Sequence, residues 1–111
     1  MNTILKASSV IILVIHGTIH LLGFVKAFEY AELKELNLPV TKKQGLVWLL
    51  TFVIFLLSAT LLVLNLEIWK LSALFAALLS QIVILTSWAD AKFGSIINVL
   101  VVILLGLTFL F

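Results

Sequence analysis

Four long apolar stretches without a charged side chain constrain this sequence more than any other feature. They cover residues 7–25, 46–64, 71–89 and 93–111. Each is close to the roughly 20 residues that cross about 30 Å of hydrocarbon as a helix. A backbone in hydrocarbon must satisfy its own hydrogen bonds, which leaves helices and closed barrels. Because short connections make neighbouring helices antiparallel, we expect an all-α fold: an up-down-up-down four-helix bundle, one transmembrane domain over residues 1–111.

The composition points the same way. The chain is 64% hydrophobic and 11% charged, with a mean hydropathy of +1.34, whereas soluble domains are about 25% charged. The lipid bilayer is therefore the expected partner. All seven basic residues are lysines without a dense cluster, so nucleic-acid binding has no electrostatic footprint. The absence of cysteine excludes disulfides and thiolate metal sites.

The flanks of the spans predict orientation and interface. Residues 26–45 should form an interfacial helix or loop, helical to about residue 36, where Asn37 and Pro39 then stop the helix. The first and third connections share one side and carry most of the lysines: Lys26, Lys34, Lys42, Lys43 and Lys92. The positive-inside bias then predicts a multi-pass protein of the cell membrane with these two connections cytoplasmic and both termini outside. The three tryptophans, at positions 48, 69 and 88, should mark the membrane interfaces.

Polar residues inside the spans are costly in lipid and therefore informative. Counted from the span ends, His16 and Gln81 lie at one depth, roughly 13 Å below the cytoplasmic surface. His20, Thr51 and Asn98 form a second layer roughly 7 Å down. The two histidines lie one helical turn apart, on the face that also carries small residues, so both should point into the bundle.

Three interpretations of the histidine pair remain open. The pair can bind a small ligand or a proton, because imidazole titrates near neutral pH. It can merely hold helices together through hydrogen bonds. It can also bind a metal, but further ligands are weak or distant. Two histidines on one helix face cannot take opposite axial positions of one haem, so a haem would have to be shared across a dimer.

Two further features bear on function. Asp90 and Lys92 flank the last connection, where they either guard the entrance of a pocket or form a capped interfacial turn. Ser72, Ala76 and Ser80 form a small-residue stripe that is typical of helix packing surfaces and permits a homo-oligomer or a membrane-complex partner. The sequence shows no nucleophile–base set, which argues against an enzyme but leaves that possibility open. It also has no carboxylate inside a span, which argues against cation-coupled export. It names no cofactor.

Two stretches resemble a known group of proteins. They are HGTIHLLGFVKAF at residues 16–28 and DAKFG at residues 90–94. In these stretches and in layout the chain resembles uncharacterised small bacterial four-span membrane proteins, and it is loosely similar to the DoxX-like families. The resemblance implies a prokaryotic inner membrane. The DoxX-like similarity further suggests an accessory role linked to respiration or quinones, by fold analogy alone.

Together these observations favour a small polytopic membrane protein. We expect a non-enzymatic module that binds a small ligand or a proton in a polar pocket in the cytoplasmic half of the bundle. The expected binding residues are His16, His20, Gln81, Asn98, Thr51, Asp90 and Lys92. The alternatives are a structural or accessory subunit of a membrane complex, and a metal or haem site at His16 and His20.

Overall fold

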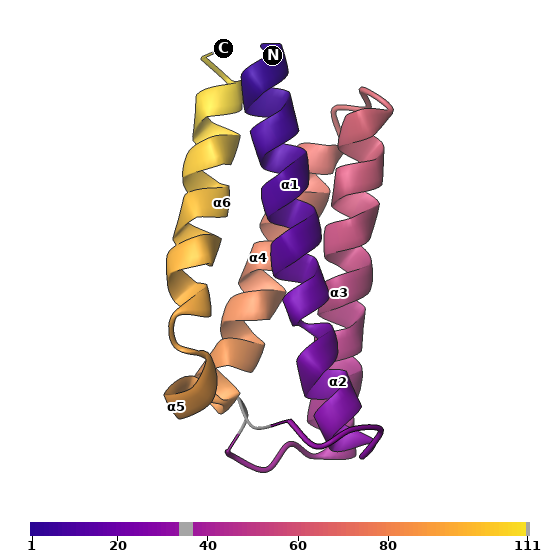
Figure 1. Ribbon diagram of the computed structural model, residues 1–111. Coiled ribbons are helices and arrows are strands. Elements are labelled where there is room, and N and C mark those ends of the chain that lie inside the picture. The colour runs from indigo at the N-terminus through magenta and orange to yellow at the C-terminus, as the bar shows by residue number, and fades with distance from the viewer. Residues whose placement is uncertain (34–36, 111) are drawn as a thin grey trace.

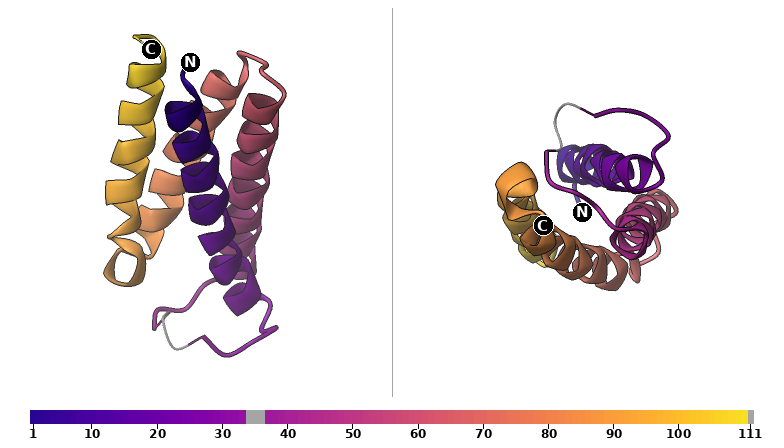
Figure 2. Two further views of the ribbon diagram at one scale, coloured as in Figure 1. Left: turned by 45° about the horizontal axis from the view of Figure 1, so that its top comes forward. Right: turned by 90° about the horizontal axis from the view of Figure 1, so that it is seen from below.

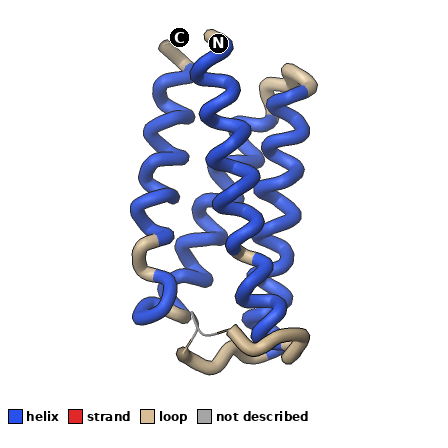
Figure 3. The backbone as a smooth tube through the Cα atoms, viewed as in Figure 1, coloured by secondary structure: helices blue, strands red, loops and turns tan. Residues whose placement is uncertain are grey.

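The computed structural model describes residues 1–33 and 37–110, and these fold into helices joined by turns (Figure 3). The elements, in chain order, are α1 (Thr3–Ile19), α2 (Leu21–Ala27), α3 (Lys42–Val63), α4 (Trp69–Thr86), α5 (Trp88–Ala91) and α6 (Gly94–Thr108). No strand occurs in the described part of the chain, so the expected all-α class is confirmed.

Helices α1 and α2 follow one another along a common line and together form the first rod of the molecule (Figure 1). This rod, α3, α4 and α6 lie side by side and are called the rods below. Around the molecule, α1 and α2 pack on α3, α3 on α4, and α4 on α6, while α1 and α6 make the smallest of these contacts (Figure 2). Lys6 Nζ donates to Asn65 Oδ1 at 2.6 Å, which places the start of α1 beside the α3–α4 turn. At the opposite end, the Leu38 N–H donates to Asp90 Oδ2 at 2.7 Å.

Three helical segments are long and apolar enough to cross a membrane: Thr3–Ala27, Lys42–Val63 and Trp69–Thr86. The predicted spans at 7–25, 46–64 and 71–89 fall largely within them. The fourth prediction, residues 93–111, is too long. Helix α6 has 15 residues, or about 22 Å at 1.5 Å per residue, because the chain still turns at Phe93 and the helix ends at Thr108. Phe111 lies outside the described residues.

The predicted interfacial helix after span one is wrong for the residues that the structure describes. Helix α2 ends at Ala27, and Glu29 adopts a left-handed conformation with φ 58°. The N–H groups of Glu29 and Tyr30 then donate to Lys26 O and Val25 O at 3.1 and 3.0 Å. This is the Schellman arrangement, which ends a helix by satisfying its last carbonyls. Residues 34–36 of the predicted helix lie outside the described part.

Helix α3 begins at Lys42, earlier than the span prediction, because Thr41 and Gln44 form a capping box. Each of their side chains accepts the other residue's backbone N–H, and the box supplies partners that the first turn of a helix lacks.

Small residues let the rods approach closely at the core. The buried cluster joins all four rods through Leu13, Phe55, Ala59, Leu62, Trp69, Ala73, Ala76, Ala77, Val101 and Leu105. The small-residue stripe of α4 is thus covered within the chain, and Ser72 Oγ lies 2.7 Å from Ser58 Oγ of α3. The stripe therefore packs within the chain, as its spacing predicts, and self-association stays a prediction.

The three tryptophans differ in their exposure. Trp88 is 48% exposed, whereas Trp48 and Trp69 are 5% and 2% exposed. Both buried indoles lie near a helix end but point inward. Trp48 packs on Gly23, where an added Cβ would overlap the indole ring.

This contact predicts the effect of adding one methyl group. Gly23→Ala should lower the free energy of unfolding by about 1–3 kcal/mol, because the methyl group must displace the Trp48 indole. Gly106→Ala is the matched control, because a Cβ there meets no atom within 4 Å. It should leave stability unchanged or raise it by up to ~1 kcal/mol through helix propensity. Thermal unfolding in detergent measures both, and equal effects would contradict the close α2–α3 contact.

Candidate functional site

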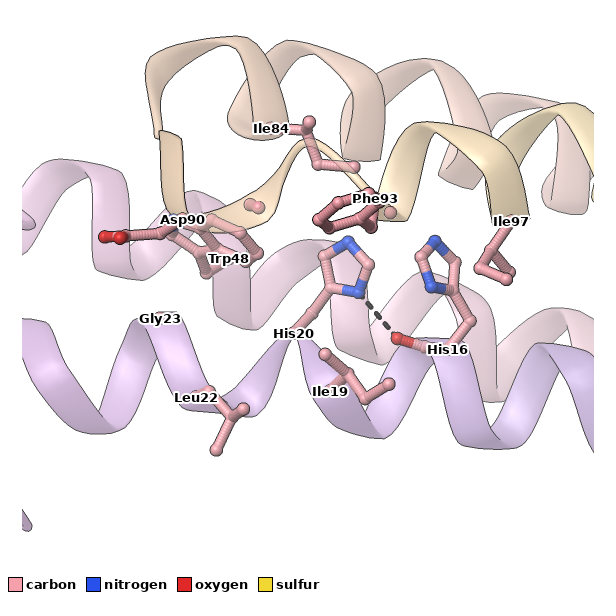
Figure 4. A pocket seen from close by; sticks show the side chains of 12 residues that line it. His16, Ile19, His20, Leu22, Gly23, Trp48, Ile84, Asp90, Phe93 and Ile97 are labelled. Carbon is pink, nitrogen blue, oxygen red and sulfur yellow. Dashed lines mark hydrogen bonds between the residues drawn. The ribbon is translucent and has the colours of Figure 1, made fainter. Parts of the chain in front are cut away.

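A break in the first rod positions the two histidines. His20 ends α1 and precedes α2, and its backbone N–H donates to Gly17 O at 2.9 Å instead of to His16 O. The His20 Nδ1 atom lies 2.7 Å from His16 O (Figure 4). The imidazole thus takes the place of the backbone donor that a continuous helix would offer to this carbonyl. Both rings are buried, His16 at 4% and His20 at 1% exposure, as their inward-facing pattern predicts.

A network of hydrogen bonds joins the histidines to α4 and α6. His16 Nε2 lies 2.8 Å from Asn98 Oδ1, and His20 Nε2 lies 2.7 Å from Ser80 Oγ. The Asn98 amide nitrogen donates to Ser80 Oγ and to Gln81 Oε1, both at 3.1 Å. Gln81 in turn donates to Ser95 Oγ at 3.0 Å. We call these six residues the polar network: His16, His20, Ser80, Gln81, Ser95 and Asn98.

The partners assign a tautomer to each ring. A carbonyl can only accept, so His20 donates from Nδ1 to His16 O, and its Nε2 accepts the Ser80 hydroxyl proton. The Asn98 amide nitrogen is the donor of that side chain, so Asn98 Oδ1 accepts from His16 Nε2–H. Both nitrogens of His20 are therefore used. The remaining atom, His16 Nδ1, is a lone-pair acceptor without a hydrogen-bond partner among the described residues.

The predicted polar layers are only partly right. Gln81 and Asn98 do join the histidines, but His16 bonds Asn98 from the other predicted layer, and His20 bonds Ser80. The predicted depths assume that the two connections end at the same height along the bundle. They do not, because α2 extends to Ala27 and α5 precedes α6. Thr51 is fully buried, yet its hydroxyl donates to Val47 O of its own helix at 2.8 Å. The structure therefore does not bring Thr51 into the network.

A cavity of about 380 Å³ lies against the network at the end where α2, α5 and the start of α6 face one another. Its walls are mostly apolar, and Figure 4 shows Ile19 and Leu22 on the α1–α2 side and Phe93 and Ile97 on the α6 side. The complete lining is His16, Ile19, His20, Leu22, Gly23, Trp48, Ile84, Asp90, Ala91, Phe93, Gly94 and Ile97. Of the network, only the two histidines reach it. A cavity therefore lies beside the histidines, but its lining is mostly apolar with one polar wall, whereas the sequence predicts a polar pocket.

Within residues 1–33 and 37–110, two buried polar side-chain atoms have no hydrogen-bond partner: Trp48 Nε1 and Ser87 Oγ. His16 Nδ1 is not one of them, although no group bonds it. Because the His16 side chain lines the cavity, its Nδ1 is the ring nitrogen that stays accessible there.

Asp90 lies at the rim of the cavity and also ties two connections together. It lines the cavity and accepts the Leu38 N–H. This bond, a further one from Asn37 and the charge of Lys26 hold the pKa of the Asp90 carboxyl below its ordinary 3.8, against a smaller opposing effect of burial. Asp90 is therefore a carboxylate at neutral pH. Lys92 does not line the cavity; its ammonium lies 5.4 Å from the centre of the Phe93 ring.

Sequence reasoning missed several parts of this site. Ser80 was assigned only to helix packing, although a serine next to Gln81 on a buried stripe is a plausible imidazole partner. Trp48 was assigned to the interface, yet its ring centre lies 5.2 Å from that of His20. The sequence does not distinguish the apolar lining residues from other apolar residues of a span, which can equally face lipid or the core.

The metal interpretation gains little from this geometry. The described residues contain no group of three or more His, Cys, Asp or Glu side chains placed to hold one ion. His20 has no free ring nitrogen, so the pair offers one nitrogen, His16 Nδ1, to a metal or a haem.

Comparison of the chain with protein-family models, with characterised proteins and with solved structures finds no match. The resemblance to the small four-span proteins and to the DoxX-like families thus stays a prediction.

The network predicts a contrast between two buried polar residues. Asn98→Leu should lower the free energy of unfolding by about 3 kcal/mol, because it leaves His16 Nε2–H and Gln81 Oε1 unpaired. Thr51→Val is the control, since Thr51 bonds only its own helix, and it should cost less than about 1 kcal/mol. Denaturant titration in mixed micelles compares the two variants. A cost for Asn98→Leu no larger than for Thr51→Val would show that the network is not connected as described.

The Asp90 contact predicts a titration at the first connection. A lowered pKa means that the bond to Leu38 is fully present above the ordinary pKa of the carboxyl and is lost as pH falls through the lowered value. The Leu38 amide proton resonance should therefore titrate with a midpoint below 3.8. Asp90→Asn should abolish this titration while its amide oxygen keeps an acceptor for Leu38. A midpoint above 3.8 in the unmodified protein would contradict the assignment.

Proposed function

We propose that this chain is a membrane-embedded, up-down-up-down four-helix bundle that binds a small, mainly apolar ligand beside His16. The exposed surface supports the membrane setting. Only 33–39% of the residues in the three apolar windows are buried in the protein. Ile11, Leu50, Leu78 and Val99 are among the many large apolar side chains that are half exposed or more. Apolar surface of this extent is far larger than soluble monomers show and suits acyl chains.

The charge distribution supports an orientation within this proposal. Lys26, Lys42, Lys43 and Lys92 lie at the end that holds the cavity, whereas Lys6 and Lys70 lie at the other. The positive-inside bias then puts the cavity in the cytoplasmic half and the termini outside. By the resemblance of residues 16–28 and 90–94, the membrane is the inner membrane of a prokaryote. Helix α6 is short for a span, and local thinning of the bilayer accommodates such a mismatch.

The observation that carries the binding function is the cavity of about 380 Å³ beside an unbonded ring nitrogen. Ligand sites are typically mostly apolar hollows of about 300–1,000 Å³ with a few placed polar groups. The cavity lies at the lower end of that range, which suits one ring or a short chain and not a whole two-chain lipid. No nucleophile and base meet at its wall, so we propose binding without chemistry.

A purely structural role is the second candidate, and one observation favours it. Within the polar network every donor and acceptor role of His20 is filled by the chain itself. Such a closed set would specify helix pairing without any ligand, as polar residues in membrane bundles commonly do. It does not account for the open nitrogen of His16 or for the cavity. On this candidate the chain is an accessory subunit of a membrane complex.

A quenching experiment separates the two candidates. One variant keeps only Trp48, through Trp69→Phe and Trp88→Phe; the control keeps only Trp69, through Trp48→Phe and Trp88→Phe. Both indoles are buried, but only Trp48 lines the cavity. Titration with 1-bromohexane in micelles should quench Trp48 with a saturating curve, whereas Trp69 should show only the weak linear quenching of partitioning.

A cavity-filling variant completes this test. Ala91→Leu adds apolar volume to the cavity wall without removing a polar group. Overpacking of this kind costs about 1–3 kcal/mol, so the affinity of Trp48-only protein for 1-bromohexane should fall at least about fivefold. Linear quenching of Trp48, unchanged by Ala91→Leu, would refute ligand binding and leave the structural role.

A further inference from the structure

The polar side-chain atom that the chain leaves open in the cavity is an acceptor. It is His16 Nδ1, whereas the Asp90 carboxylate at the rim already accepts the Leu38 N–H. The other polar atoms of the lining side chains are not available to a ligand. Both ring nitrogens of His20 form hydrogen bonds within the chain, and Trp48 Nε1 is buried. A ligand beside His16 therefore meets a lone pair.

The cavity also opens sideways. Helix α2 packs on α3, and it is not among the helices with an extensive contact to α5 or α6. The lips on the two sides are apolar and exposed, with Ile19 at 50% and Phe93 at 70%. In a bilayer these side chains face lipid. On this side the path to His16 therefore starts in the acyl-chain region.

We infer that the ligand is a neutral amphiphile that enters from the lipid and donates a hydrogen bond, such as the hydroxyl of a phenol or an alcohol, to His16 Nδ1. This inference rests on the proposed binding function and specifies its ligand class. A fatty acid does not fit, because its ionised head group can only accept and has no hydrogen to offer the lone pair of His16. A ketone or ether does not fit either, because it has no hydrogen to offer His16.

Three compounds that share one hexyl chain test the ligand class. They are 4-hexylphenol, which has a donor, 4-hexylanisole, in which a methyl group replaces that hydrogen, and 4-hexylbenzoate, which is an anion. Each competes with 1-bromohexane for Trp48-only protein. One neutral hydrogen bond is worth about 0.5–1.5 kcal/mol, so the phenol should bind about three- to tenfold more tightly than the anisole. The benzoate should bind most weakly.

His16→Phe keeps an aromatic ring and removes the acceptor, so the phenol should lose its advantage over the anisole in that variant. If this variant does not fold, imidazole ¹⁵N NMR of unmodified protein decides. The phenol should shift the His16 Nδ1 resonance and leave both His20 resonances in place, and the anisole should shift neither ring.

The outcomes are distinguishable. Equal binding of phenol and anisole, or tightest binding of benzoate, overturns the ligand class while binding itself stands. No competition by any compound, together with linear quenching by 1-bromohexane, refutes the proposed binding function as well.

Discussion

The bond from the His20 side chain to the His16 carbonyl is the interaction on which the site depends. A helix normally offers each carbonyl the N–H four residues later, and here an imidazole nitrogen takes that role at 2.7 Å. The bond fixes the His20 tautomer, which makes its second nitrogen an acceptor for Ser80. Ser80 in turn positions Asn98, and Asn98 takes the donor of His16. A side-chain donor in place of one backbone N–H thus determines which ring nitrogen of His16 has no hydrogen bond.

Connected networks of this kind have an all-or-none character. Inside an apolar bundle an unpaired polar group costs more than the net gain from pairing it. Each member of the polar network therefore restricts the rotamer and tautomer of the next, from α1 through α4 to α6. The same reasoning explains why Thr51 of α3, which is also buried, contributes no specificity: its hydroxyl donates to a carbonyl of its own helix.

The sequence predicts the features that depend on composition and period. The all-α class, three membrane-length helices and the inward faces of His16 and His20 follow from apolar length and helical spacing. The pairing of His16 with Asn98 cannot be predicted in this way. It depends on the height of α6 relative to α1, and the short helix α5 changes where α6 begins. The break at His20 also escapes prediction, since it requires the serine of a distant helix to fix the imidazole. Lining residues such as Ile97 are indistinguishable from lipid-facing ones before the rods are placed.

The cavity follows from two opposing features at one end of the bundle. On one side, the glycines at positions 23 and 45 draw α2 against α3, because neither has a side chain to hold the backbones apart. On the other side, the short helix α5 takes the chain outward before α6 begins at Gly94. Helices α2 and α6 therefore lie apart at this end of the bundle. Space remains between them at the level of the histidines, where a polar wall already exists, so the fold places an opening beside the one imidazole nitrogen that the network leaves unpaired.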